Sequence, residues 1–283
     1  MKRTLNSILL VALSLIATLG GGWMYFHSKA RSTPVKTPFD HPFLHLAHKD
    51  QRPVVLFRTN LPSDNPAKLA SAFATKAGKP LADVNLGLWL DVRLTNDGAL
   101  IVSQNELLTT GSTVGKPIEL ATLDDCKNAG LFELKDFAAG IEKSPTVLNL
   151  IARRPGLAKR ILDMWGPPPM PLSLSNTVLH SESDGVLKEL REAQPRGLYG
   201  TSQSTIIQIE MLANLDLQAL VDLKSDLLIS STVELVPAPE PRLRKSTLDE
   251  AKRRGLKRYA GPTSDPAKVL QMLADGYDGV LID

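Results

Sequence analysis

The sequence of 283 residues contains a single cysteine, Cys126, and its formal net charge at pH 7 is only +3. One cysteine excludes an internal disulfide framework and any cysteine-rich zinc site. Four of the 33 basic residues lie in residues 1–31, which contain no acidic residue, so the rest of the chain carries 29 basic against 30 acidic groups. Nucleic-acid binding requires a basic face, so we expect no nucleic-acid partner. The hydrophobic content of 43% is that of a globular protein.

Charge is also absent from residues 5–26, a run of 22 residues. At about 1.5 Å per residue, a helix of this length crosses a hydrocarbon core of about 30 Å. Lys2 and Arg3 precede the run and Trp23 and Tyr25 lie near its end, a pattern typical of a membrane anchor with a cytoplasmic N-terminus. The alternative is a cleaved signal peptide, although no clear A-x-A cleavage site follows. Both interpretations predict that the rest of the chain leaves the cytoplasm.

We therefore divide the chain into an anchor or signal segment (1–30), a linker (31–52) and a globular body (53–283). The linker contains several prolines, which oppose helix formation. It also contains His41, His45 and His48, but Pro42 interrupts their spacing and no thiol accompanies them. A solvated linker is favoured over a metal site.

Eight short apolar runs recur through the body, and helical stretches separate nearly all of them. They are residues 54–57, 86–92, 147–152, 177–180, 197–199, 226–230, 257–260 and 279–282. Continuous apolar strands are typical of a parallel sheet covered on both faces, so the α/β pattern predicts a (β/α)8 TIM-type barrel. The alternative is an open doubly wound sheet, but no G-x-G-x-x-G follows the first run. A usual barrel has a helix after its eighth strand, and we expect the linker to cover the closing seam instead.

Four segments of the body contain an ordered set of motifs. They are VVLFRT (54–59), DVRLTNDG (91–98), LNLIAR (148–153) and DGVLID (278–283). Together they resemble the glycerophosphodiester phosphodiesterase family of phospholipase-C-like barrels, whose motifs are V-V-x-H-R-G, E-x-D-V-x-x-T-x-D-G, L-N-I-E-I-K and D-G-I-I-T-D. The segment from Asp91 to Gly98 is the most specific match. The resemblance implies a phosphoric diester hydrolase of lipid metabolism that uses two histidines and one calcium or magnesium ion.

The departures from the family fall on its catalytic positions. The two histidine positions are Phe57 and Gln104, and neither side chain exchanges a proton at neutral pH. Two glutamate positions for the metal are Trp89 and Ile151, which leaves Asp91 as the metal ligand that the resemblance retains. Calcium takes six to eight oxygens, so this ligand set is incomplete and we expect no cofactor.

The residues that survive from the motifs are candidates for binding substrate or phosphate. They are Arg58, Asp64, Asn65 and Arg153. Two functions stay open: a membrane-anchored phosphodiesterase-like protein with weak or no activity, and a non-catalytic binding module. The module would take a phosphorylated headgroup, from a phospholipid or glycerophosphodiester, or a protein partner at the cell envelope. We expect a single-pass membrane protein with its barrel in the periplasm or outside the cell, or a secreted protein if the segment is cleaved.

Two further features have a structural and a functional interpretation. His180 ends the fourth apolar run, where a barrel histidine with satisfied hydrogen bonds is favoured over a catalytic one. Residues 200–205 (GTSQST) follow the fifth run and could bind an anion at a helix N-terminus. A helix-capping loop is the favoured interpretation there.

Overall fold

A computed structural model describes residues 52–283, except 79, 82, 167–169, 216 and 231–242, together with residues 14, 18, 20–25 and 28. Most of the predicted anchor (5–26) and the linker up to residue 51, with its three histidines, lie outside the described residues. Among the residues that are described, no helix is both long and apolar enough to span a bilayer.

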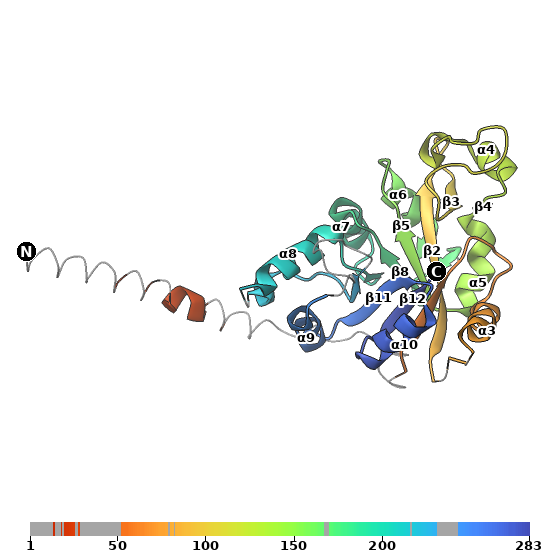
Figure 1. The fold of residues 1–283 in the computed structure, drawn as a ribbon. Helices are drawn as coiled ribbons and strands as arrows, with labels where there is room; N and C mark the ends of the chain where they lie inside the picture. Colours follow the sequence, from red (N-terminus) through yellow and green to blue (C-terminus); the bar gives the residue numbers. More distant parts are fainter. Residues whose placement is uncertain are drawn as a thin grey trace, which may run out of the picture.

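The body is built on eight parallel strands, which coincide with the eight apolar runs predicted from the sequence. They are β1 (Val54–Arg58), β2 (Asn85–Leu94), β5 (Thr146–Leu150), β8 (Thr177–His180), β9 (Leu198–Tyr199), β10 (Leu227–Ser230), β11 (Lys257–Thr263) and β12 (Gly279–Ile282). The sheet order is β10-β11-β12-β1-β2-β5-β8-β9, so the first and last strands of the chain are neighbours. This arrangement is the near-closed TIM-type barrel in Figure 1.

The seam between β9 and β10 is short. A parallel bridge joins Gly200 to Leu227, and the Asp226 amide donates to the Tyr199 carbonyl at 2.8 Å. Side chains extend this ladder, because the Thr201 hydroxyl donates to the Leu227 carbonyl at 2.8 Å and the Tyr199 amide donates to the Asp226 carboxylate at 3.1 Å. Two side chains therefore supply hydrogen bonds that the two-residue strand β9 is too short to make.

Helices form the outer layer around the strands (Figure 1). They are α3 (Pro66–Ala77), α4 (Leu123–Asn128), α5 (Ala138–Lys143), α6 (Leu157–Leu162), α7 (Asp184–Ala193), α8 (Gln203–Ala213), α9 (Lys245–Arg253) and α10 (Pro266–Ala274). Several begin at a side chain that accepts a hydrogen bond from the first turn, as Thr122 does for α4 and Ser183 for α7.

Strand side chains alternate between the barrel interior and the helical layer. Each of the eight strands contributes to one interior cluster, which includes Leu56, Trp89, Val147 and Tyr259. The Tyr259 ring fills the space beside Gly279 so closely that a Cβ there would lie 2.1 Å from it. The alternate residues of the strands, such as Phe57, pack outward against the helices.

One large excursion leaves the barrel after β2. Strand β3 (Leu100–Val102) pairs antiparallel with β2, as the turn at residues 95–98 requires, and β4 (Phe132–Glu133) pairs with β3. The 3-10 helix Ile118–Leu120 and α4 lie between them. The short strands β4, β6 (Trp165–Gly166) and β7 (Leu172–Ser173) were not predicted, because two residues are too few for a periodic pattern.

Candidate functional site

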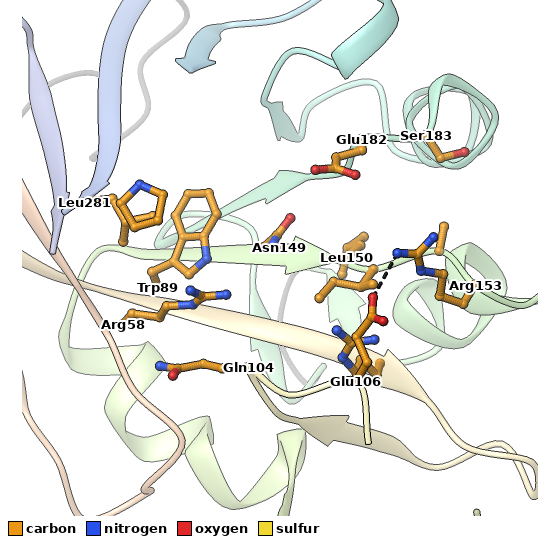
Figure 2. Close-up of a pocket in the computed structure, with 14 residues that line it drawn as sticks. Arg58, Trp89, Gln104, Glu106, Asn149, Leu150, Arg153, Glu182, Ser183 and Leu281 are labelled. Atoms are coloured by element: carbon orange, nitrogen blue, oxygen red, sulfur yellow. Dashed lines mark hydrogen bonds and ion pairs between the residues drawn. The ribbon is translucent and has the colours of Figure 1, made fainter. Parts of the chain in front are cut away.

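A cavity of about 500 Å³ opens at the carboxyl ends of the strands, where TIM barrels carry their active sites. Its wall comes from β1, β2, β5, β11 and β12 and from the loops after β3 and β8. Figure 2 shows Arg58, Trp89, Asn149 and Gln104 together at one side of this cavity. Polar side chains here lie directly above the apolar interior of the barrel.

The floor of the cavity rests on the carboxylate of Asp91, which is fully buried and does not itself line the cavity. Its Oδ1 accepts hydrogen bonds from the Trp89 indole N–H at 3.0 Å and from the Asn149 amide at 2.6 Å. Its Oδ2 accepts from Arg58 Nε at 2.5 Å. Three donors from β1, β2 and β5 therefore surround one carboxylate.

Arg58 reaches from this floor toward the mouth. Its Nη1 donates to Asp283 at 3.0 Å, and its Nη2 has no hydrogen-bond partner in the described part of the chain. Burial alone would lower the pKa of the Arg58 guanidinium, but the charges of and hydrogen bonds to Asp91 and Asp283 outweigh burial and raise this pKa. The guanidinium is therefore a permanent and fixed positive charge.

The mouth carries a second arginine in a different setting. Arg153 Nη2 donates to Glu106 Oε1 at 2.9 Å, and both side chains are largely exposed. Figure 2 shows this pair on the side of the cavity away from Trp89. Deeper in the wall, Arg93 is buried and pairs with Glu119 at 2.8 Å. Each arginine of the cavity thus has a carboxylate partner, so an anionic ligand must compete for it.

The structure brings together only some of the predicted site residues. Arg58, Gln104, Ile151 and Arg153 line the cavity, as does Trp89. The side chain of Phe57 does not, because it points into the outer layer and its ring packs edge-on against Phe73 at 6.4 Å. At the end of β1 the residue that faces the cavity is Arg58.

Asp64 and Asn65 lie in the loop between β1 and α3. Asp64 accepts from the Thr59 hydroxyl at 2.7 Å and pairs with Lys68 at 3.2 Å. Asn65 caps α3 by accepting from the Lys68 amide at 2.8 Å. Both side chains are engaged in loop and cap structure and are not part of the cavity wall.

The residues present do not fit a divalent cation. Asp91 shares its oxygens among three N–H donors, Trp89 supplies a donor in place of an acceptor, and Ile151 supplies no polar atom. Within the described residues, no three histidine, cysteine, aspartate or glutamate side chains form a group that could hold a metal ion. A hard cation needs several oxygen ligands, and the side chains that contact Asp91 offer N–H groups instead.

His180 is buried in the barrel, as predicted, and its ring centroid lies 5.6 Å from that of Trp89. Burial lowers the pKa of His180 to about 4, so the imidazole is neutral at physiological pH. The prediction that its hydrogen bonds are satisfied is wrong for Nδ1, which has no hydrogen-bond partner among the described atoms. A Cβ on Gly200 would lie 2.5 Å from this nitrogen. Glycine at this position is what gives the imidazole room.

Residues 200–205 form a capping loop. Ser202 caps α8 by accepting from the Thr205 amide, and the carboxylate of Asp184 accepts from the hydroxyls of Ser202 and Ser204. The protein's own carboxylate therefore occupies the hydroxyl cluster that the sequence suggested for an anion.

Sequence reasoning missed Asn149 as a member of the site. The signal was available, because side chains two residues apart in a strand face the same side. Asn149 is two residues from Val147 in β5 and lies opposite Asp91 in the register of β2 and β5. No motif was needed to place the Asn149 amide next to Asp91.

No family model matches the chain, and no curated protein matches its sequence. Solved structures do match it. A glycerophosphodiester phosphodiesterase from Parabacteroides distasonis is 18% identical, with a TM-score of 0.54, over 83% of this chain and 94% of that one. One from Thermotoga maritima is 18% identical, with a TM-score of 0.51, over 83% and 96%.

A phosphodiesterase from Oleispira antarctica, solved with the product sn-glycerol-3-phosphate, is also 18% identical, with a TM-score of 0.50, over 82% of this chain and 93% of that one. These matches span nearly the whole barrel of the solved proteins. Because the identities are this low, the shared property is the fold. The chain has the barrel fold of the glycerophosphodiester phosphodiesterases.

Proposed function

We propose that this protein binds a phosphorylated headgroup at the cell envelope and does not hydrolyse it. The fold supports a phosphodiesterase-like ligand, and the Oleispira antarctica protein of the same fold holds sn-glycerol-3-phosphate. The observation that carries the proposal is the state of Asp91, whose oxygens are taken by donors from Arg58, Trp89 and Asn149. The two positions at which the family resemblance places acid–base histidines offer no such group, since Gln104 is an amide and Phe57 faces away from the cavity.

Binding has suitable donors at the same place. The free Nη2 of Arg58 and the amide of Gln104 border the cavity, and Arg153 lies at its mouth. A phosphate accepts hydrogen bonds from guanidinium groups in a bidentate manner. The ligand would bind the Nη2 of Arg58, which no described residue occupies, and would replace Glu106 on Arg153, whose pair is exposed and weak.

We further propose that residues 5–26 attach the protein to a membrane, with the barrel on the outer side. The support is the uncharged run of 22 residues and its flanking Lys2 and Arg3. A reporter that is active only outside the cytoplasm, fused after Asp283, should be active and should sediment with membranes. Recovery of the fusion in the soluble cytoplasm would refute the attachment.

Turnover and binding are measured on the same full-length preparation. Glycerophosphocholine is incubated with saturating magnesium or calcium, and sn-glycerol-3-phosphate is titrated by calorimetry. We expect no turnover and saturable binding that Arg153→Ala weakens. Turnover that Asp91→Ala abolishes would show an enzyme, and absence of binding by sn-glycerol-3-phosphate would refute the headgroup.

A further inference from the structure

We propose that the guanidinium of Arg58 replaces a divalent cation in this barrel, so that anions bind the cavity without metal. The inference rests on the proposed function, because it names the charge that faces the ligand. Its test measures metal binding and folding in the absence of ligand, so the two proposals can fail separately.

The groups that surround Asp91 at the floor are N–H donors. A cation and an N–H donor compete for the same lone pairs of a carboxylate, which offers about four acceptor sites. Three of those sites on Asp91 already face Arg58, Trp89 and Asn149 at 2.5, 3.0 and 2.6 Å. A metal ion would have to displace a guanidinium from a carboxylate that has no exposure to water.

The charge balance supports the same exchange. The two positions that resemble metal-binding glutamates are Trp89 and Ile151, and neither carries a negative charge. In the motif V-V-x-H-R-G the arginine matches Arg58, so this chain keeps the guanidinium and lacks the two glutamates. The positive charge of Arg58 then neutralises the buried Asp91 without a metal ion. The loss of the glutamates and the loss of the metal ion are therefore electrically consistent.

The position of Arg58 is fixed and its free edge is presented to the cavity. Nε is held by Asp91 from β2 and Nη1 by Asp283, the residue after β12. Nη2 makes no hydrogen bond to any described residue, and Figure 2 shows the guanidinium between Trp89 and Gln104 at the cavity wall. An arginine held at two nitrogens cannot swing away, so it acts as a bound ion does.

The test uses the full-length protein without ligand, with magnesium or calcium titrated by calorimetry and by thermal unfolding. Wild-type protein should give no saturable heat up to about 1 mM of either ion and the same Tm in EDTA. Arg58→Ala should lower Tm by about 5 °C or more. Millimolar calcium or magnesium should restore part of that loss, because the carboxylates of both Asp91 and Asp283, which Arg58 holds in the wild type, are then open to the ion.

Two variants control this result. Arg160→Ala removes an arginine from an exposed pair with Asp163, at 3.7 Å, and should respond to neither ion. Arg58→Ala with Asp91→Asn should lose the restoration. If Arg58→Ala does not fold in EDTA, recovery of folded protein on refolding with calcium is the supporting result, and Arg58→Lys should fold and stay insensitive to both ions.

Three results would overturn the inference. The first is saturable binding of either ion by the wild-type protein. The second is a folded or refolding Arg58→Ala protein that no divalent ion stabilises. The third is a requirement for calcium or magnesium in Arg58→Lys. Failure of sn-glycerol-3-phosphate to bind, with the metal results as expected, would refute the headgroup alone.

Discussion

Two arginine–carboxylate pairs border the same cavity and differ in almost every physical respect. Arg58 and Asp91 meet at the floor, where the carboxylate is 0% exposed and has two further donors. Arg153 and Glu106 meet at the mouth, where the side chains are 63% and 60% exposed. Exposed pairs contribute about 0–1 kcal/mol, whereas removing one partner of a buried pair costs about 3–5 kcal/mol.

The comparison separates a fixed part of the site from an exchangeable part. The floor joins β1, β2 and β5 through one carboxylate, so a change there is a change in the barrel itself. The pair at the mouth joins two loops and can open without disturbing a strand. Ligand entry should therefore alter the mouth and leave the floor in place.

The largest effect is expected from breaking the floor. Arg58→Met leaves Asp91 as a buried charge without its cation, and should lower the free energy of unfolding by about 3–5 kcal/mol in urea denaturation. Adding Asp91→Asn to this variant should recover part of the loss, because no buried charge then remains. Equal stability of the single variant and the wild type would contradict the difference between floor and mouth.

The next effect is the pH dependence of the free energy of unfolding that His180, the neighbour of Trp89, should cause. Below pH 6.5 the unfolded chain binds a proton on His180, while the folded chain stays neutral until about pH 4. The free energy of unfolding should therefore decrease as the pH falls from 6.5 to 4, by about 3 kcal/mol from this group, and no further below pH 4. Urea denaturation of the wild type and His180→Asn at several pH values between 6.5 and 4 measures this decrease. If the free energy of unfolding falls equally steeply with pH in the variant, His180 is not its cause.

A smaller effect is expected from a single donor of the floor. Trp89→Phe keeps an aromatic ring in the barrel but removes the N–H that Asp91 accepts at 3.0 Å. Hydrogen bonds to charged groups contribute about 1.5–3 kcal/mol, so unfolding should become easier by about 2 kcal/mol. A loss well above this range would mean that ring packing against His180 contributes more than the hydrogen bond to Asp91. Trp89→Tyr would then lose a similar amount of stability.

The smallest change in stability is expected at the mouth. Glu106→Gln should change the free energy of unfolding by less than about 0.5 kcal/mol, because its pair with Arg153 is exposed. The same change frees Arg153, so binding of sn-glycerol-3-phosphate should tighten several-fold at low salt and less at high salt. Calorimetry at two ionic strengths tests this, and weaker binding would show that Glu106 itself contacts the ligand.

The sequence predicted the fold well because most barrel strands are largely apolar runs, although β11 begins with Lys257 and Arg258. The pattern at residues 279–282 and at 177–180 matches β12 and β8 residue for residue. The excursion between β3 and β4 was out of reach, since its course depends on contacts such as that of the Thr110 hydroxyl with the Ala129 carbonyl. Such contacts join residues that no local pattern relates.

The site was predicted less completely than the fold. Motif order identified Arg58 and Asp91, which are in contact, but it also grouped them with Asp64 and Asn65, which serve the loop and the cap of α3. Motif order also ignores which way a side chain points. The alternation along β1 allows only one of Phe57 and Arg58 to face the cavity, and this rule could have been applied to the sequence.

The outward direction of Phe57 has a consequence for the evolution of this barrel. A histidine introduced at position 57 would enter the layer between β1 and α3, beside Phe73 and away from the cavity. No single substitution at position 57 places a proton-exchanging group in the cavity. For that, β1 would have to shift by one residue, which would also shift its hydrogen-bond register with β2 and β12. Position 57 is therefore closed to a proton-exchanging group that faces the cavity, whereas position 104, in the loop after β3, lines the cavity and is open to one.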